Sequence, residues 1–291
     1  MHTDIIHPRL TTSARSLKEA IFRSTEDLIL LIGPSGVGKT HLVNKVTRQI
    51  AAKNKNPAHL PVVSFRLRQY TERFNWSSLL RDLLRETGHA SSRSNTLEAA
   101  WSKIALAQSA RQTRVVFIDE ATPLFCAQSA VMLENNRTVI RRIGPGAKVV
   151  LIVNSDVLAG LARVSSQSLR RLQIVPFHRY TTAPRDMRTF RSLLARIDAT
   201  SSPRDLKLSA RPQQIYNGCG GFVGILLTWL EAARRQSTLK HRTPILTAAA
   251  LARTRLPDSE LALCLRQALL FERQIPPTGW AIKSQMKRPA A

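Results

Sequence analysis

The clearest pattern along the chain is an alternation of short apolar runs with helical stretches, which continues to about residue 180. Each apolar run is rich in Val, Ile, Leu or Phe, as expected of strands buried on both faces. The predicted strands cover residues 28–33, 61–65, 115–119, 148–154 and 173–177. The stretches around them predict helices over residues 13–23, 41–53, 76–86, 96–109 and 131–142. We therefore expect an α/β fold, with a parallel five-stranded sheet and helices on both faces.

After about residue 183 the strands stop and only helical patterns follow. Ser-Pro, Gly-Gly and Leu-Pro breaks separate predicted helices over residues 185–197, 222–235, 244–255 and 258–273. The change predicts four parts: a lead-in over 1–27, an α/β core over 28–183, a small helical domain over 184–273 and a basic, Pro-containing tail over 274–291. The longest apolar stretches fall well short of the ~20 residues that a membrane span needs. We expect no membrane partner and a cytoplasmic protein.

The strongest chemical signal is the motif GPSGVGKT, which follows the first predicted strand and opens a helix. Glycines allow such a loop to aim its backbone N–H groups at phosphate oxygens, and the helix N-terminus adds partial positive charge. An ordinary glycine-rich turn is the alternative, but the strand–loop–helix context favours a P-loop. The predicted phosphate-binding residues are Gly33, Pro34, Ser35, Gly36, Val37, Gly38, Lys39 and Thr40. In this arrangement Lys39 contacts the β and γ phosphates of ATP, and the Thr40 hydroxyl binds Mg²⁺.

A second motif, VVFIDEA, ends the third predicted strand in two carboxylates. An acidic residue at the end of a buried strand is costly unless it has a partner such as a metal ion. We expect Asp119 to hold the Mg²⁺ shell and Glu120 to polarise the attacking water. The alternative for Glu120 is a solvated charge at a strand end.

Two further positions belong to the predicted active site. Asn154 ends the fourth predicted strand, where its amide is expected to orient water or contact the γ-phosphate, although many strands end in Asn for turn reasons alone. Arg170 and Arg171 precede the fifth strand. An arginine there is expected to reach the γ-phosphate of a neighbouring subunit, so that hydrolysis depends on assembly.

The charge of the chain is strongly one-sided. Forty-four Lys and Arg residues stand against 19 Asp and Glu residues, which gives a formal net charge of +25. Arginine predominates, and its planar guanidinium matches phosphate oxygens. The balance favours nucleic acid as the partner, with a membrane surface or an acidic protein as the alternatives. The three cysteines lie far apart without a CxxC pair, which argues against a zinc ribbon and a disulfide framework.

Together, the P-loop, the Asp-Glu pair, the terminal Asn, the late arginines and the trailing helices resemble the AAA+ ATPases. The HPRL lead-in, FIDEA, VLIVNSD and GFVGILLTWLEAARRQ are similar to the TniB/TnsC family of transposon-encoded ATPases, with MuB and IstB as near neighbours. The resemblance covers roughly residues 5–255 and makes the helical domain an AAA+ lid. Many AAA+ proteins have a nucleotide-sensing arginine near the GFVG-like turn, and residues 221–224 offer none.

The resemblance implies an ATP-dependent homo-oligomer, a ring or helical filament, that coats duplex DNA and recruits a DDE transposase and a TniQ-type targeting protein. ATP hydrolysis would dismantle the coat. It also implies that His7 and Pro8 border the adenine. Residues expected to line a DNA-binding pore are Arg66, Arg68, Arg73, Lys103, Arg137, Arg141 and Arg142, each with a solvated surface charge as the alternative.

Three other functions fit parts of the pattern. A helicase loader or replication initiator of the same superfamily would bind single strands or have an added DNA-reading domain, and no helix-turn-helix or run of exposed aromatics is evident. A STAND-type signalling ATPase would normally continue into a repeat array. An ATP-binding scaffold would bind ATP but hydrolyse it negligibly, with Glu120 supporting almost no turnover.

Overall fold

We describe a computed structural model of the chain, covering residues 8–26, 28–67, 76–88, 96–125, 135, 138–144, 146–161, 172–241 and 245–276. The chain divides into two compact units. We call residues 14–32 and 39–176 the sheet unit, and residues 1–13, 33–38 and 177–291 the helical unit. Each unit is described by itself below, and the four-part division expected from the sequence stays a prediction.

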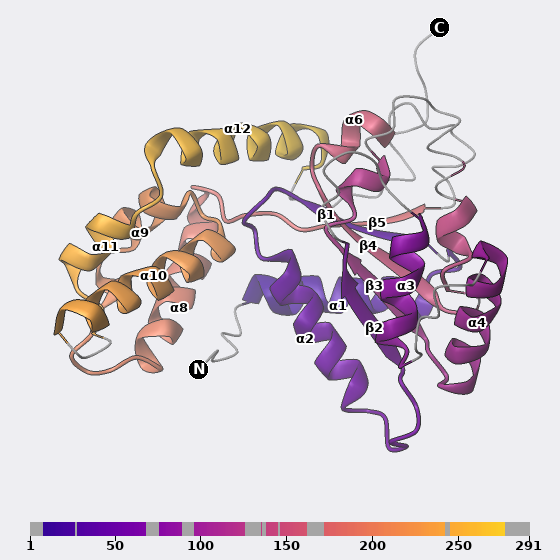
Figure 1. The fold of residues 1–291 in the computed structure, drawn as a ribbon. Coiled ribbons are helices and arrows are strands. Elements are labelled where there is room, and N and C mark those ends of the chain that lie inside the picture. Colours follow the sequence, from indigo (N-terminus) through magenta and orange to yellow (C-terminus); the bar gives the residue numbers. More distant parts are fainter. Residues whose placement is uncertain are drawn as a thin grey trace, which may run out of the picture. The chain divides into compact units, whose positions relative to one another are not determined.

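The sheet unit contains the five parallel strands that the apolar runs predict (Figure 1). These are β1 (Leu28–Gly33), β2 (Val62–Arg66), β3 (Val115–Asp119), β4 (Lys148–Asn154) and β5 (Leu172–Pro176), in the spatial order β2-β3-β4-β1-β5. All six residues of β1 are buried, as are the first four of β3 and the middle five of β4. Burial on both faces explains why these strands are continuously apolar.

The helices of this unit lie on both faces of the sheet (Figure 1). They are α1 (Pro8–Arg23, from residue 14 onward), α2 (Lys39–Ala51), α3 (Trp76–Glu86), α4 (Leu97–Ala110) and α6 (Val157–Leu161), with the 3-10 helix η1 (Thr122–Phe125). The buried face of α2 consists of the residues that the helical spacing selected, Leu42, Val43, Val46 and Ile50, together with Lys39. The Thr96 hydroxyl caps α4 by accepting from Ala99 N. Of the helix predicted over 131–142, only part lies within the described residues.

The helical unit contains α8 (Pro184–Ala199), α9 (Pro212–Cys219), α10 (Val223–His241), α11 (Ala248–Thr254), α12 (Asp258–Gln274) and the 3-10 helix η2 (Leu208–Ala210). Four of these helices match the predicted ones, whereas α9 was not expected. The apolar core of the helical unit includes Tyr180, Phe190, Leu194, Tyr216 and Trp229. Gly220 and Gly221 both have positive φ, so the glycine pair ends α9 in a left-handed turn that leads into α10.

The parallel register places several polar strand ends at one edge of the sheet. Arg66, the last residue of β2, is in register with Asp119, the last residue of β3. Asn154 ends β4, the next strand in the sheet. Ligands of open parallel sheets bind at the carboxyl ends of the strands, so this edge is where a site is expected. Within the part of the chain that the structure describes, no helix has the length and apolarity needed to cross a membrane.

Candidate active site

The loop Gly33–Gly38 adopts a conformation that depends on its glycines. Gly36 and Gly38 have φ values of +74° and +103°, where a side chain is strained. A Cβ on Gly33 would lie 2.2 Å from the carbonyl oxygen of Phe177. The loop is therefore bare backbone held in a tight turn, which suits the phosphate-binding role expected of it. Pro34 and Val37 are buried, and Ser35 is exposed.

Lys39 begins α2, and its side chain is buried. The Lys39 ammonium donates to Asn154 Oδ1 at 2.9 Å. The backbone N–H of Asn154 in turn donates to Thr122 Oγ1 at 3.0 Å, which fixes the end of β4. Burial lowers the pKa of Lys39 to about 8, against the opposing effect of Asp119, Glu120 and Asp156. Burial disfavours the charged form of Lys39, and a bound phosphate would stabilise that form.

Thr40 and Asp119 meet at the carboxyl end of β3. Thr40 Oγ1 donates to Asp119 Oδ2 at 2.7 Å, and the other carboxylate oxygen, Oδ1, accepts from Glu120 N at 2.9 Å. A hydroxyl and a carboxylate are hard oxygen ligands of the kind that Mg²⁺ prefers. The described residues include no cluster of three or more His, Cys, Asp or Glu side chains placed to hold a metal ion. Mg²⁺ commonly takes only one or two protein ligands together with substrate phosphates, so the pair fits this ion.

Glu120 has an unusual backbone and an unexpected partner. Its φ is +57°, a left-handed conformation that is uncommon for residues other than glycine. Its carboxylate accepts from Arg66 Nη2 at 2.8 Å. The Arg66 side chain is 71% exposed and that of Glu120 34% exposed, so the pair is a surface ion pair that other charges can disrupt. One of the residues expected to face DNA thus contacts the residue expected to activate water.

In the helical unit, the first turn of α10 lies directly against the P-loop backbone. Ile225 N donates to the carbonyl oxygen of Gly36 at 3.2 Å. A Cβ on Gly224 would lie 2.5 Å from the same oxygen, and a Cβ on Gly36 would lie 2.7 Å from Ile225 Cγ1. The GFVG turn, which lacks a sensing arginine, therefore approaches the loop through glycine backbone.

The other predicted site residues are scattered. Pro8 is exposed at the start of α1, and Lys103 is exposed on α4. Arg142 pairs with Glu98 at 2.8 Å and lies over the Trp101 ring, 5.5 Å from its centroid. Arg141 is partly buried. The predicted residues outside the described part of the chain are His7, Arg68, Arg73, Arg137, Arg170 and Arg171.

One polar cluster in the helical unit was missed by the sequence argument. The buried Arg179 pairs with Glu272 at 3.0 Å and donates to Tyr216 Oη at 3.0 Å. Arg9 donates to the backbone oxygen of Arg179 and to Asp186. These partners lie up to 177 residues apart in the sequence, so no local spacing could have revealed them. Desolvation raises the pKa of Glu272, with Arg179 opposing the change.

Comparison with known proteins gives one family match and many structural ones. Residues 22–159 match a family of AAA domains. The Aeropyrum pernix ORC1 protein, solved in complex with DNA, is 15% identical, with a TM-score of 0.62 over 87% of this chain and 65% of that chain. The Aeropyrum pernix ORC2 protein, solved as ADPNP-ADP complexes, is 14% identical, with a TM-score of 0.56 over 88% of this chain and 69% of its own. A Walker-type ATPase of Pyrococcus abyssi is 15% identical, with a TM-score of 0.54 over 93% of this chain and 77% of its own.

None of the curated protein sequences matches the chain. At identities this low, the structural likeness is one of fold. The fold is that of an AAA+ P-loop ATPase, with a five-stranded parallel sheet and a helical region after it, which confirms the predicted fold class. The match to a family of AAA domains supports ATPase activity in general. The narrower resemblance to TniB and TnsC stays a prediction.

Proposed function

We propose that the chain is a Mg²⁺-dependent ATPase that assembles on duplex DNA. The observation that carries the enzymatic part is the pair of hydrogen bonds Lys39–Asn154 and Thr40–Asp119. They join the start of the helix after the P-loop to the ends of β4 and β3, where phosphates and a divalent ion are bound in folds of this kind. The ORC2 neighbour, solved with ADPNP and ADP, is consistent with a nucleotide ligand.

In this proposal each residue of the strand ends has one role. The Lys39 ammonium neutralises charge on the β and γ phosphates, and Asn154 orients it or the attacking water. Thr40 and Asp119 hold Mg²⁺, which would neutralise charge developing on the phosphate oxygens. Glu120 polarises the water once its carboxylate is released from Arg66. Arg170 or Arg171 supplies the cation of a neighbouring subunit.

Duplex DNA is the proposed partner because of charge. A net +25 on 291 residues favours contact with a phosphate backbone of any sequence. The ORC1 neighbour, solved in complex with DNA, supports the same class of partner. From the resemblance to TniB and TnsC, we infer that the homo-oligomer regulates transposition, recruits a DDE transposase and a TniQ-type protein, and is dismantled by ATP hydrolysis.

A replication-initiator or helicase-loader role is the second candidate. It is favoured by a specific observation, namely the fold likeness to ORC1 and ORC2 over 87% and 88% of this chain. The two candidates differ in the nucleic acid and in the assembly. A transposition regulator coats duplex of any sequence in an ATP-dependent manner, whereas a loader prefers single strands or stays a small assembly.

The test is sedimentation of the purified chain with duplex or single-stranded DNA, in ATP, ADP or no nucleotide, at low and high salt. We expect ATP-dependent rings or filaments on duplex, sensitive to salt and lost with Lys39→Ala. Preference for single strands would support the loader instead. An assembly that forms with ATP but is unchanged in Glu120→Gln would indicate a scaffold without useful hydrolysis.

A further inference from the structure

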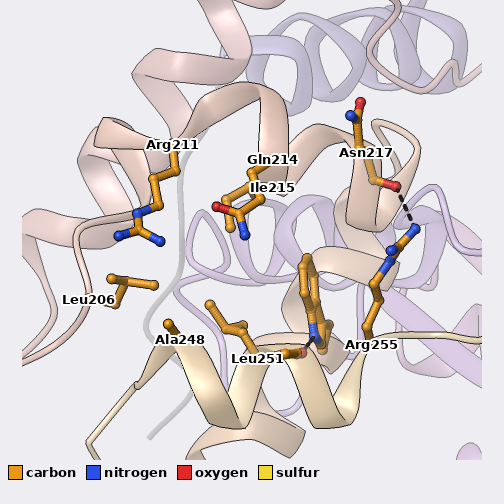
Figure 2. A pocket seen from close by; sticks show the side chains of 10 residues that line it. Leu206, Arg211, Gln214, Ile215, Asn217, Ala248, Leu251 and Arg255 are labelled. Carbon is orange, nitrogen blue, oxygen red and sulfur yellow. Dashed lines mark hydrogen bonds between the residues drawn. The ribbon is translucent and has the colours of Figure 1, made fainter.

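A groove of about 540 Å³ lies within the helical unit, away from the residues of the proposed ATPase site in sequence. Figure 2 shows that one wall consists of Arg211, which precedes α9, and of Gln214 and Asn217 on that helix, and that α11 forms the other wall, through Ala248 and Leu251. The remaining lining residues are Leu206, Ile215, Trp229, Ala252 and Arg255. A volume of this size falls in the range of sites that take a small ligand or a few residues of a peptide.

The inner part of the groove is apolar and rigid. Ile215, Trp229 and Leu251 line it and are buried members of the core of this unit. The indole N–H of Trp229 donates to the Leu251 carbonyl at 2.9 Å, which fixes the ring between α10 and α11. With its polar atom already bonded, the indole offers the groove an apolar surface. Such a surface favours leucine-like or aromatic side chains of a ligand.

An arginine lies at each end of the groove. Arg211 lies at one end of the groove near Leu206, and Arg255 lies at the opposite end beside Asn217 (Figure 2). Arg255 donates to the Asn217 carbonyl at 3.5 Å and pairs with Asp258 at 2.7 Å. Within the described part of the chain, Arg211 has no ion-pair partner, and no carboxylate lines the groove. An exposed fork of guanidinium donors beside an apolar surface matches a carboxylate attached to an apolar chain.

We propose that this groove docks a short acidic and apolar peptide segment of a protein partner, with a carboxylate on Arg211 and an apolar side chain against Trp229. Duplex DNA is a poorer match, because phosphates and sugars gain nothing from the buried surface of Ile215, Trp229 and Leu251. The chain's own tail is also a poor match: residues 277–291 contain Lys283, Lys287 and Arg288 and no acidic residue. Like charges would oppose its binding at the arginines.

Peptide binding in the groove requires neither ATP nor DNA, since all lining residues belong to the helical unit. Its failure is therefore distinguishable from failure of the proposed function. The probe is a library of random heptapeptides displayed on phage and selected against the immobilised full chain, without nucleotide or DNA. Enriched peptides are then synthesised with a fluorescent label, and their affinities are measured by anisotropy.

We expect enriched peptides to combine Asp or Glu with Leu, Phe or Trp. Arg211→Glu should weaken their binding by at least about tenfold, because it places a like charge at the carboxylate position. Ala252→Trp, which fills the groove without changing charge, should weaken it to a similar extent. Arg253→Glu is the matched control, since Arg253 is exposed on α11 outside the lining. It should change affinity by less than about twofold.

Four outcomes would overturn the proposal. Selection without an acidic and apolar consensus is the first, and a consensus that binds the Arg211→Glu and wild-type chains equally is the second. The third is a loss of duplex affinity in Arg211→Glu much greater than in Arg253→Glu, which would assign the groove to DNA. The fourth is a change in self-association in Ala252→Trp, which would assign it to a second copy. Thermal unfolding of each variant identifies any that fails to fold.

Discussion

Asp119 in the sheet unit and Asp198 in the helical unit show how differently the two units use a carboxylate. Asp119 is partly exposed at the end of β3 and accepts from the Thr40 hydroxyl and from Glu120 N. Asp198 is buried near the end of α8 and accepts from Leu208 N, Ser209 N and the Ser209 hydroxyl. The first carboxylate stays accessible to a ligand, whereas the second satisfies backbone donors that would otherwise be buried without partners.

The same contrast extends to the other charges. In the helical unit, Asp205 is buried and accepts from Leu246 N at 2.9 Å, and Arg179 is buried against Glu272. In the sheet unit, Glu120 and Arg66 pair at the surface. In the proposed function, charge near the strand ends serves binding and reaction, whereas the buried charges Asp198, Asp205 and Arg179 of the helical unit satisfy internal partners.

The largest effect is expected from Lys39→Ala. Loss of the buried ammonium that donates to Asn154 should reduce ATP hydrolysis by at least about 100-fold, since it removes charge stabilisation in the transition state. Phosphate release at saturating ATP measures this. Because burial already disfavours the charge of Lys39, thermal stability without nucleotide should not fall. A variant that keeps a tenth or more of the activity would contradict the assignment.

Asp198→Ala should have the opposite profile. It removes the acceptor for three hydrogen bonds and leaves the buried N–H of Leu208 and the partly buried N–H of Ser209 without it. We expect a loss of about 2–4 kcal/mol in the free energy of unfolding, measured by urea denaturation. The control is Asp258→Ala, whose side chain is 82% exposed and should change stability by less than about 1 kcal/mol. Equal losses in the two variants would mean that the buried Asp198 contributes no more to stability than the exposed Asp258.

Gly224→Ala should affect both stability and nucleotide binding. The added methyl group would meet the Gly36 carbonyl at 2.5 Å, so the P-loop or the first turn of α10 must shift. We expect a loss of about 1–3 kcal/mol in the free energy of unfolding, together with weaker ATP binding by titration calorimetry. Ile225→Ala sharpens the result, because it keeps the backbone N–H that donates to Gly36. It should retain ATP affinity within a few-fold.

A smaller, pH-dependent effect is expected from His178. Neither ring nitrogen has a hydrogen-bond partner among the described residues, and the ring lies 4.9 Å from that of Phe271. Burial and the nearby Arg9, against a weaker opposing effect of Asp186, lower the pKa of His178 to about 4. As pH falls from about 6.5 to 4, the imidazole of His178 therefore takes up a proton in the unfolded chain at a higher pH than in the folded chain. Stability should be full above this window and fall within it, by about 1–3 kcal/mol.

His178→Phe should remove that slope from a series of urea denaturation curves between pH 4 and 7. A slope that persists unchanged in the variant would assign the acid sensitivity to other groups, such as the carboxylates of the helical unit.

The smallest effect is expected from Arg66→Ala. The Arg66–Glu120 pair is exposed, so its loss should change the free energy of unfolding by less than about 1 kcal/mol. Freeing the Glu120 carboxylate should raise the DNA-free rate of ATP hydrolysis by about two- to threefold. Arg142→Ala is a suitable control, because Arg142 pairs with Glu98 rather than with a residue of the site. An unchanged rate in Arg66→Ala would mean that the pair does not restrain Glu120.

The sequence predicted the sheet well because its strands are buried on both faces and therefore stand out as continuous apolar runs. The helix α9 was missed, since its eight residues PQQIYNGC are too few to show a helical period, and it is held by tertiary packing of Ile215, Tyr216 and Cys219. At the candidate site, contiguous motifs predicted Lys39, Thr40, Asp119 and Glu120, and their roles stay predictions. The Arg66–Glu120 and Arg179–Glu272 pairs could not be predicted, because their members are 54 and 93 residues apart and only the fold brings them together.

The hydrogen bond between Thr40 and Asp119 has a consequence for the entropy of metal binding. A threonine hydroxyl has a single proton, and here it is donated to Asp119 Oδ2. The oxygen is left with only lone pairs to offer, and the hydrogen bond favours one rotamer of the Thr40 side chain before any ligand arrives. The Thr40 side chain would then lose little rotamer entropy when Mg²⁺ binds its oxygen. Preorganisation of this kind lowers the entropic cost of metal binding. Thr40→Val, which removes the hydroxyl oxygen, should therefore weaken binding more than Thr40→Ser, which keeps it.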